Sequence, residues 1–197
     1  MTGVIMVNAR QRMIESAAQL MRERGVEATS FSDVIEHSGA PRGSIYHHFP
    51  GGKAQLVEEA TRWAGAYIGR GIAASHENGD PLDALEAMAN FWRQVLGSSE
   101  FAAGCPVVAG TVEGDRTPGA REAAGEVFAG WQELIGDNLV EHGVEPERAA
   151  SLAAILLGAT EGAVILSRAE RSMEPFERTM SELRTLLSDA LAERARV

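Results

Sequence analysis

The spacing of apolar residues constrains the fold most, because they recur every three or four positions along almost the whole chain. This spacing places them on one face of a helix, whereas a half-buried strand needs strict alternation of apolar and polar residues. The sequence holds no such alternation of useful length. Proline marks several helix starts, since it follows an acidic residue or threonine at 80–81, 117–118, 145–146 and 174–175. We therefore predict an all-α protein of about nine helices.

Three short helices precede six others in this prediction. The second opens with a capping box formed by Ser30 and Asp33, and proline suits the first position of the third. The expected helices span roughly 8–25, 30–39, 41–49, 53–74, 80–96, 105–114, 117–143, 145–171 and 174–195. No flexible linker is visible between the two halves. We expect an N-terminal three-helix domain over residues 1–53 and a second helical domain over 54–197.

Charge is distributed unevenly between these two parts. The formal net charge is -10, which taken alone argues against a nucleic-acid partner. Residues 1–63, however, carry seven basic and seven acidic side chains, whereas residues 64–197 carry 11 basic and 21 acidic ones. The whole excess of negative charge therefore lies outside the N-terminal third, which leaves that third free to approach DNA.

Residues 29–53 (TSFSDVIEHSGAPRGSIYHHFPGGK) have the pattern of a helix-turn-helix, two short helices joined by a glycine-containing turn. The start of the second helix in such a motif meets base edges in the major groove, where arginine binds guanine with two hydrogen bonds. Hydroxyl, imidazole and ammonium groups hold phosphates. The predicted DNA-contacting residues are Thr29, Ser30, Arg42, Gly43, Ser44, Tyr46, His47 and Lys53.

The same residues resemble the signature of the TetR/AcrR family of regulators. A glycine, then T-S, D-V-I, G-A-P-R-G-S-I-Y-H-H-F, G-K and L follow one another in order over residues 25–56. The proline before the recognition helix, the two glycines before Lys53 and the run Gly104-Cys105-Pro106-Val107-Val108 are similar to the LmrA/YxaF branch. The resemblance implies a dimeric repressor that leaves a palindromic operator when a small effector enters its C-terminal half.

The C-terminal half carries two apolar helix stripes, along residues 152–166 and 176–191, separated by steps of three and four. Small residues four apart at 158–163 allow close helix approach, either inside one chain or in a dimer of the last two helices, which the resemblance implies. The middle helices hold all three tryptophans. We expect an apolar or aromatic effector in a cavity lined by Phe91, Trp92, Val108, Thr111, Trp131 and Thr160, although all of these also suit a plain core.

Other functions remain open at this point. Cys105, the single cysteine, is a candidate nucleophile or redox sensor, but no histidine forms a recognisable pair with it. The adjacent His47 and His48 point about 100° apart on a helix, so we expect no metal site there and no cofactor. A pure interaction module, an all-α dimer with no DNA role, is the third reading. No run of about 18 apolar residues or signal peptide is visible, so we expect a cytoplasmic protein without membrane spans.

Overall fold

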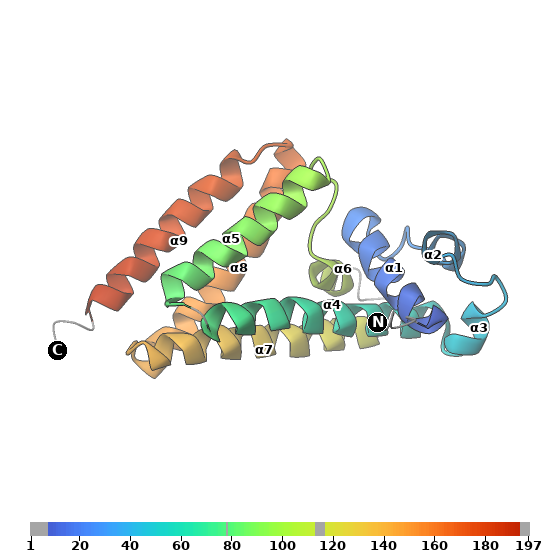
Figure 1. Ribbon diagram of the computed structural model, residues 1–197, viewed down its shortest axis with the longest axis horizontal. Helices are drawn as coiled ribbons and strands as arrows, with labels where there is room; N and C mark the ends of the chain where they lie inside the picture. The colour runs from blue at the N-terminus through green and yellow to red at the C-terminus, as the bar shows by residue number, and fades with distance from the viewer. Residues whose placement is uncertain (1–7, 78, 113–116, 194–197) are drawn as a thin grey trace, which may run out of the picture. The chain divides into compact units, whose positions relative to one another are not determined.

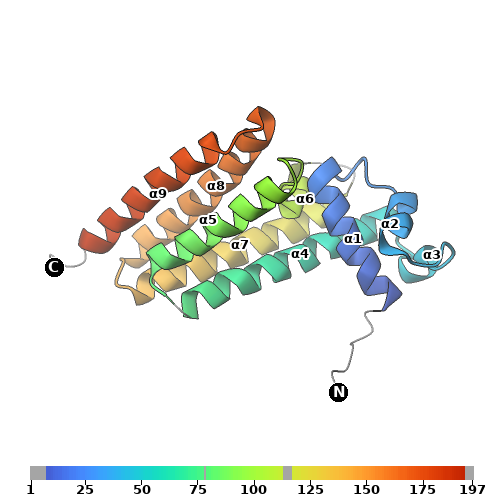
Figure 2. The same cartoon turned by 45° about the horizontal axis from the view of Figure 1, so that its top comes forward.

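The computed structural model describes residues 8–77, 79–112 and 117–193, and within these ranges it contains nine helices and no strand (Figures 1 and 2). The predicted all-α fold is confirmed. In chain order the helices are α1 (Ala9–Arg24), α2 (Phe31–Ser38), α3 (Ile45–His48), α4 (Gly52–Glu77), α5 (Pro81–Ser98), α6 (Pro106–Val112), α7 (Pro118–Glu141), α8 (Pro146–Glu170) and α9 (Glu174–Glu193).

The local start signals act as their chemistry requires. The Asn8 side chain accepts a hydrogen bond from the Gln11 amide, and Asp80 accepts from the amides of Leu82 and Asp83. Each bond satisfies an amide that the first turn of a helix leaves without an intrahelical partner. Pro81 follows Asp80 as the first residue of α5, where its missing N–H costs nothing.

The third helix is shorter than predicted. It begins at Ile45 rather than Pro41, because residues 41–44 form a turn in which the Pro41 carbonyl accepts from the Ser44 amide at 3.0 Å and from the Ser44 hydroxyl at 2.7 Å. α4, in contrast, begins at Gly52 and runs to Glu77. The predicted helix over 105–114 ends at Val112, and residues 113–116 lie outside the described part of the chain.

The chain forms two compact units. The first comprises the residues up to Ala66 together with Cys105–Val127, and therefore contains α1, α2, α3, α6 and parts of α4 and α7. In it α1 packs against α2, α3 and α6. Its core is built from side chains with 2% exposure or less, among them Met13, Met21, Val34, Ile45, Phe49 and Leu56. This core fixes the short helices, which are too short to be stable alone.

The second unit comprises Tyr67–Gly104 and Phe128–Val197. Here α8 packs along α9, and α5 packs against both (Figures 1 and 2). Arg93 on α5 donates to both carboxylate oxygens of Glu177 on α9, at 2.7 and 2.9 Å, and to Glu86 at 2.7 Å. The buried Ser167 hydroxyl accepts from the Phe176 amide at 3.1 Å. That bond fixes the turn between α8 and α9.

Candidate DNA-binding surface and ligand cavity

The start of α2 is held by a complete capping box. The Ser30 hydroxyl accepts from the Asp33 amide at 3.2 Å, and the Asp33 carboxylate accepts from the Ser30 amide at 2.9 Å. The hydroxyl also donates to the carboxylate at 2.5 Å. These hydrogen bonds from Ser30 hold the pKa of Asp33 below its ordinary value. The predicted capping box is confirmed, and it leaves the Ser30 side chain exposed at the start of α2.

Two buried side chains orient α3 and the turn before it. Ile45 and Phe49 are 0% and 1% exposed and bind the segment to the core, while Tyr46 between them is 70% exposed. The Tyr46 ring rests edge-on against Phe31, with centroids 5.5 Å apart. Residues one position apart on a helix face different sides. The buried pair therefore presents the Tyr46 hydroxyl to the outside.

The turn at 42–44 adds a guanidinium beside this exposed ring. Arg42 and Gly43 are exposed, and Ser44 is half-buried. Within residues 8–77, 79–112 and 117–193, the Arg42 side chain makes no hydrogen bond or ion pair, whereas Arg10 is paired with Glu59. Arg62 is likewise paired, with Glu58 and Glu126. Arg42 thus keeps all of its donors for a partner outside the chain.

Thr29, Lys53 and His47 occupy three different environments. Thr29 is 3% exposed, and its hydroxyl donates to the Gly25 carbonyl at 2.8 Å, so this side chain serves the interior. The Lys53 ammonium donates to the Glu27 carbonyl at 2.9 Å, which leaves two of its three N–H groups for another acceptor. His47 is exposed, and its ring lies 5.5 Å from the ring of His48.

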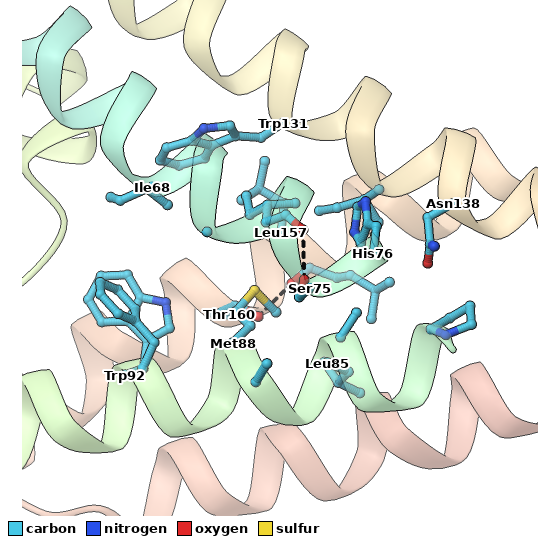
Figure 3. Close-up of a pocket in the computed structure, with 18 of the residues that line it drawn as sticks. Ile68, Ser75, His76, Leu85, Met88, Trp92, Trp131, Asn138, Leu157 and Thr160 are labelled. Carbon is cyan, nitrogen blue, oxygen red and sulfur yellow. Dashed lines mark hydrogen bonds between the residues drawn. The ribbon is translucent and has the colours of Figure 1, made fainter. Parts of the chain in front are cut away.

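The second unit contains a cavity of about 450 Å³. Helices α4, α5, α7, α8 and α9 all contribute side chains to its wall, which is mostly apolar (Figure 3). A volume in the range of about 300–1,000 Å³ with few polar groups is typical of small-molecule sites. Among the residues predicted from sequence, Phe91, Trp92, Trp131 and Thr160 line this cavity.

Val108 and Thr111 do not line the cavity. Both lie on α6, which belongs to the first unit and packs against α1. The Thr111 hydroxyl donates to the Val107 carbonyl at 3.0 Å, within its own helix. The sequence indicated a short helix here, but it carried no information about which helices pack against it.

Several polar residues of the cavity wall were missed by sequence reasoning: Arg70, Ser75 and His76 on α4 and Asn138 on α7. Burial lowers the pKa of His76 below its ordinary value of 6.5; the nearby Glu141 carboxylate opposes this shift and His142 adds to it. Asn138 is only 4% exposed. A polar residue on an amphipathic helix is normally taken as solvent-facing, so no local signal in the sequence distinguishes these residues.

Cys105 is buried at 6% exposure. It precedes Pro106 and Val107 at the start of α6, and a buried thiol often packs as a small apolar side chain. In the described part of the chain, no group of three or more histidine, cysteine or acidic side chains is placed to hold a metal ion.

Two family models match the sequence, each over a different part of the chain. Residues 13–60 match the bacterial regulatory proteins of the tetR family, and residues 81–182 match the C-terminal domain of LmrA/YxaF-like transcriptional regulators. The two matches cover the helix-turn-helix and most of the second unit. The resemblance inferred from residues 25–56 and 104–108 is therefore confirmed.

Individual relatives and solved structures agree with these matches. An HTH-type transcriptional regulator of Mycobacterium tuberculosis is 43% identical over 197 residues, covering 97% of this chain and all of that one. The HTH-type transcriptional regulator LmrA of Bacillus subtilis is 29% identical and covers 86% of this chain and 91% of its own length.

Among solved structures, the regulatory protein TetR of Rhodobacter sphaeroides superposes with a TM-score of 0.80 at 20% identity, covering 90% of this chain and 97% of that one. This likeness establishes the shared fold. Together with the identity to the mycobacterial regulator, it leaves one conclusion: the chain belongs to the TetR family of DNA-binding transcriptional regulators, in its LmrA/YxaF-like branch.

Proposed function

We propose that the protein is a repressor that binds a palindromic operator as a homodimer and leaves it when a small molecule fills the cavity of the second unit. The observation that carries this proposal is the geometry of the segment from Arg42 to Tyr46, which we call the recognition segment. Arg42, Gly43 and Tyr46 are exposed, while the buried Ile45 and Phe49 anchor the segment to the core. The large apolar cavity in the other unit supports control by an effector.

In this proposal the side chains divide into base and phosphate contacts. Arg42 forms two hydrogen bonds with a guanine, and Ser44 contacts a neighbouring base edge. Gly43 lets the backbone approach the groove. Tyr46, His47, Lys53 and Ser30 hold phosphates and set the register. Thr29 takes part only through its backbone, because its side chain is buried and bound to the Gly25 carbonyl.

Fluorescence anisotropy with DNA from immediately upstream of the protein's own gene tests the DNA contacts. The variants are Arg42→Ala and Tyr46→Phe, which removes the hydroxyl but keeps the ring on Phe31. Arg121→Ala is the matched control, since it removes the same charge from an exposed position on α7, outside the recognition segment and the helices proposed to form the dimer. We expect affinity to fall by about fivefold or more with Arg42→Ala, because a bidentate base contact is worth about 1–3 kcal/mol.

Tyr46→Phe should weaken binding without changing its salt dependence, because the lost hydroxyl carries no charge, and Arg121→Ala should bind like the parent. Raising the salt concentration should weaken the parent steeply, because contacts between basic side chains and phosphates release counterions. If a selection from random sequences also yields no binding sequence, or if Arg121→Ala reduces affinity as much as Arg42→Ala, the assignment of the recognition segment is wrong.

The homodimer is proposed to form through α8 and α9. Three large apolar side chains on α8 are exposed: Ile155 at 43%, Ile165 at 51% and Leu166 at 52%. α8 is also long and apolar enough to cross a membrane by length and composition. A second subunit accounts for this apolar surface, and a symmetric dimer matches a palindromic operator.

Because the proposed operator is DNA, we propose that the protein works in the cytoplasm.

Sedimentation velocity distinguishes this interface from other surfaces. Leu166→Glu should shift the protein from dimer to monomer, since a charge in an apolar interface is buried without a partner. Val140→Glu on α7, where the parent residue is 40% exposed, should leave the dimer intact. A dimer that survives Leu166→Glu and Ile165→Glu together would place the interface elsewhere.

Release by an effector requires that the ligand bind the low-affinity conformation more tightly. α4 is the proposed carrier, because this single helix contributes Lys53 to the first unit and His76 to the cavity. A molecule found by thermal-shift screening should lower operator affinity at saturation, and operator DNA should weaken its binding by the same factor. Equal operator affinity with and without saturating ligand would contradict this mechanism.

A further inference from the structure

The side-chain amide of Asn138 is buried at one end of the cavity with a donor to spare. Within residues 8–77, 79–112 and 117–193, its Nδ2 has no hydrogen-bond partner. Its backbone carbonyl is occupied, accepting from the His142 amide at 3.2 Å and lying 2.8 Å from His142 Nδ1. A buried polar group without a partner is rare in a folded protein and calls for a bound group or water.

Two hydroxyls of the cavity wall, those of Ser75 and Thr160, have already placed their protons. Ser75 donates to the Ile72 carbonyl at 2.7 Å, and Thr160 donates to the Leu156 carbonyl at 2.7 Å. Each hydroxyl therefore offers only lone pairs to a ligand. Asn138 differs from both, because its unused group is an N–H donor on a residue that lines the same cavity.

The Asn138 amide and the Trp92 ring lie toward different ends of the cavity. In Figure 3, Asn138 and His76 lie toward one end and Trp92 toward the other. Trp92 and Trp131 are 5% and 4% exposed, and Phe91 packs edge-on against Trp92 with centroids 5.3 Å apart. This aromatic part of the wall suits a flat apolar body, since aromatic groups prefer edge-to-face or offset contacts.

The charges of the wall select against an anion. Glu161 contributes a half-buried carboxyl group to the cavity. Among the described lining residues the lone arginine or lysine is Arg70, which is exposed and whose guanidinium lies 5.8 Å from the ring centroid of Tyr67. A carboxylate ligand at the Asn138 end would therefore be desolvated without a buried cation to pair with it.

We infer that Asn138 is the specificity-determining anchor for the effector, which is an uncharged molecule with an aromatic body and a hydrogen-bond acceptor oxygen at one end. This inference rests on the proposed effector-controlled function and adds the chemistry of the ligand to it. The Asn138 Nδ2 donates to the acceptor oxygen, and the aromatic body lies against Trp92 and Trp131. The neutral His76 ring supplies a second donor or acceptor beside it.

Two probes of nearly equal shape test the anchor. 2-Acetylnaphthalene carries a ketone oxygen, and 2-isopropylnaphthalene has a methyl group in its place. Isothermal titration calorimetry on the full-length protein should show the ketone binding about tenfold more tightly, a factor equivalent to about 1.4 kcal/mol. Asn138→Leu and Asn138→Val, two apolar replacements of different size, should each reduce this preference to less than about twofold.

Ser75→Ala is the matched control, because it removes a polar group from the same wall whose proton is already used. It should keep the tenfold preference, and circular dichroism should show that each variant is folded. Equal affinities in the parent, a preference that survives in a folded Asn138 variant, or no binding of either probe would overturn the inference. Operator binding by the parent and by Arg42→Ala, which needs no effector, decides the proposed function separately.

Discussion

Gly65 is the position where the packing allows the sharpest prediction of stability. It lies in α4, within the first unit, and faces Val127 of α7. A Cβ atom added at Gly65 would overlap with Cγ2 of Val127 and lie 2.7 Å from its Cγ1 and 3.1 Å from its Cβ. All three atoms belong to one β-branched side chain, which has a single strongly preferred rotamer in a helix. Val127 therefore cannot rotate away, and α4 and α7 must move apart.

The size of the effect follows from two opposing terms. Adding a methyl group to a filled space costs about 1–3 kcal/mol, and an overlap of this depth belongs at the upper end of that range. Alanine in place of glycine returns about 1 kcal/mol through helix propensity. We expect Gly65→Ala to lower the free energy of unfolding by about 1–2 kcal/mol. For a chain of this length the midpoint of thermal unfolding should fall by about 2–8 °C.

Urea unfolding followed by circular dichroism, at one protein concentration, measures this difference. Gly125→Ala on α7 is the matched control, since its Cβ meets nothing within 4 Å, and it should stabilise the protein by about 0.5–1 kcal/mol. Val127→Ala should rescue Gly65→Ala, with a coupling above the roughly 0.5 kcal/mol seen for independent sites. The reasoning is refuted if Gly65→Ala is as stable as Gly125→Ala, or if the double-mutant cycle shows no coupling.

Three further predictions concern charge and capping, and urea unfolding at several pH values checks each. The lowered pKa of His76 means that the unfolded chain binds a proton more readily, so stability should fall as the pH drops from about 7 through 6.5, and His76→Gln should flatten this decline. Arg93 holds the pKa of Glu177 below its ordinary 4.5, so Arg93→Met should cost up to about 1 kcal/mol at pH 7, and this difference should vanish as the pH falls through the lowered pKa of Glu177. Ser30→Ala removes the cap of α2 and should cost about 1 kcal/mol.

Each of these predictions has an outcome that contradicts it. A pH dependence unchanged by His76→Gln would assign the decline to another group. A stability difference between parent and Arg93→Met that persists at pH 2 would mean that Arg93 contributes through packing of its methylene groups. For Ser30, replacement by Thr should preserve stability, because its hydroxyl can make the same hydrogen bonds with Asp33. A Ser30→Ala protein as stable as the parent would contradict the capping role.

The helix-turn-helix shows where local chemistry suffices for prediction. The capping box of Ser30 and Asp33 depends on residues three apart, so its chemistry is visible in the sequence and appears unchanged in the structure. The start of α3 was placed too early, at Pro41, because the fixed φ of proline suits both a helix and the first central positions of a turn. The Ser44 hydroxyl, which closes the turn on the Pro41 carbonyl, is the group that distinguishes the two.

The cavity shows where sequence reasoning ends. Phe91, Trp92 and Trp131 were expected to line a cavity because the middle helices are rich in aromatic residues, which suit a plain core equally well. Periodicity cannot reveal whether the space between buried faces is filled, because a packed core and a hollow one have the same period. Asn138 has no signal in the sequence that marks it as a wall residue, although only 4% of it is exposed in the structure.

The proposed control by an effector places a physical requirement on α4. The helix has 26 residues and so extends about 39 Å at a rise of 1.5 Å per residue, with Lys53 at its start and His76 near its end. A ligand beside His76 therefore acts on the recognition segment only if α4 has two alternative positions that ligand and operator favour differently. Because Gly65 has no side chain, α4 lies close against Val127. Gly65→Ala should therefore shift the equilibrium between the two positions of α4 and leave Arg42 and Asn138 unchanged. If α4 transmits the signal, this variant should show an altered coupling between ligand binding and operator binding, although both contact surfaces are intact.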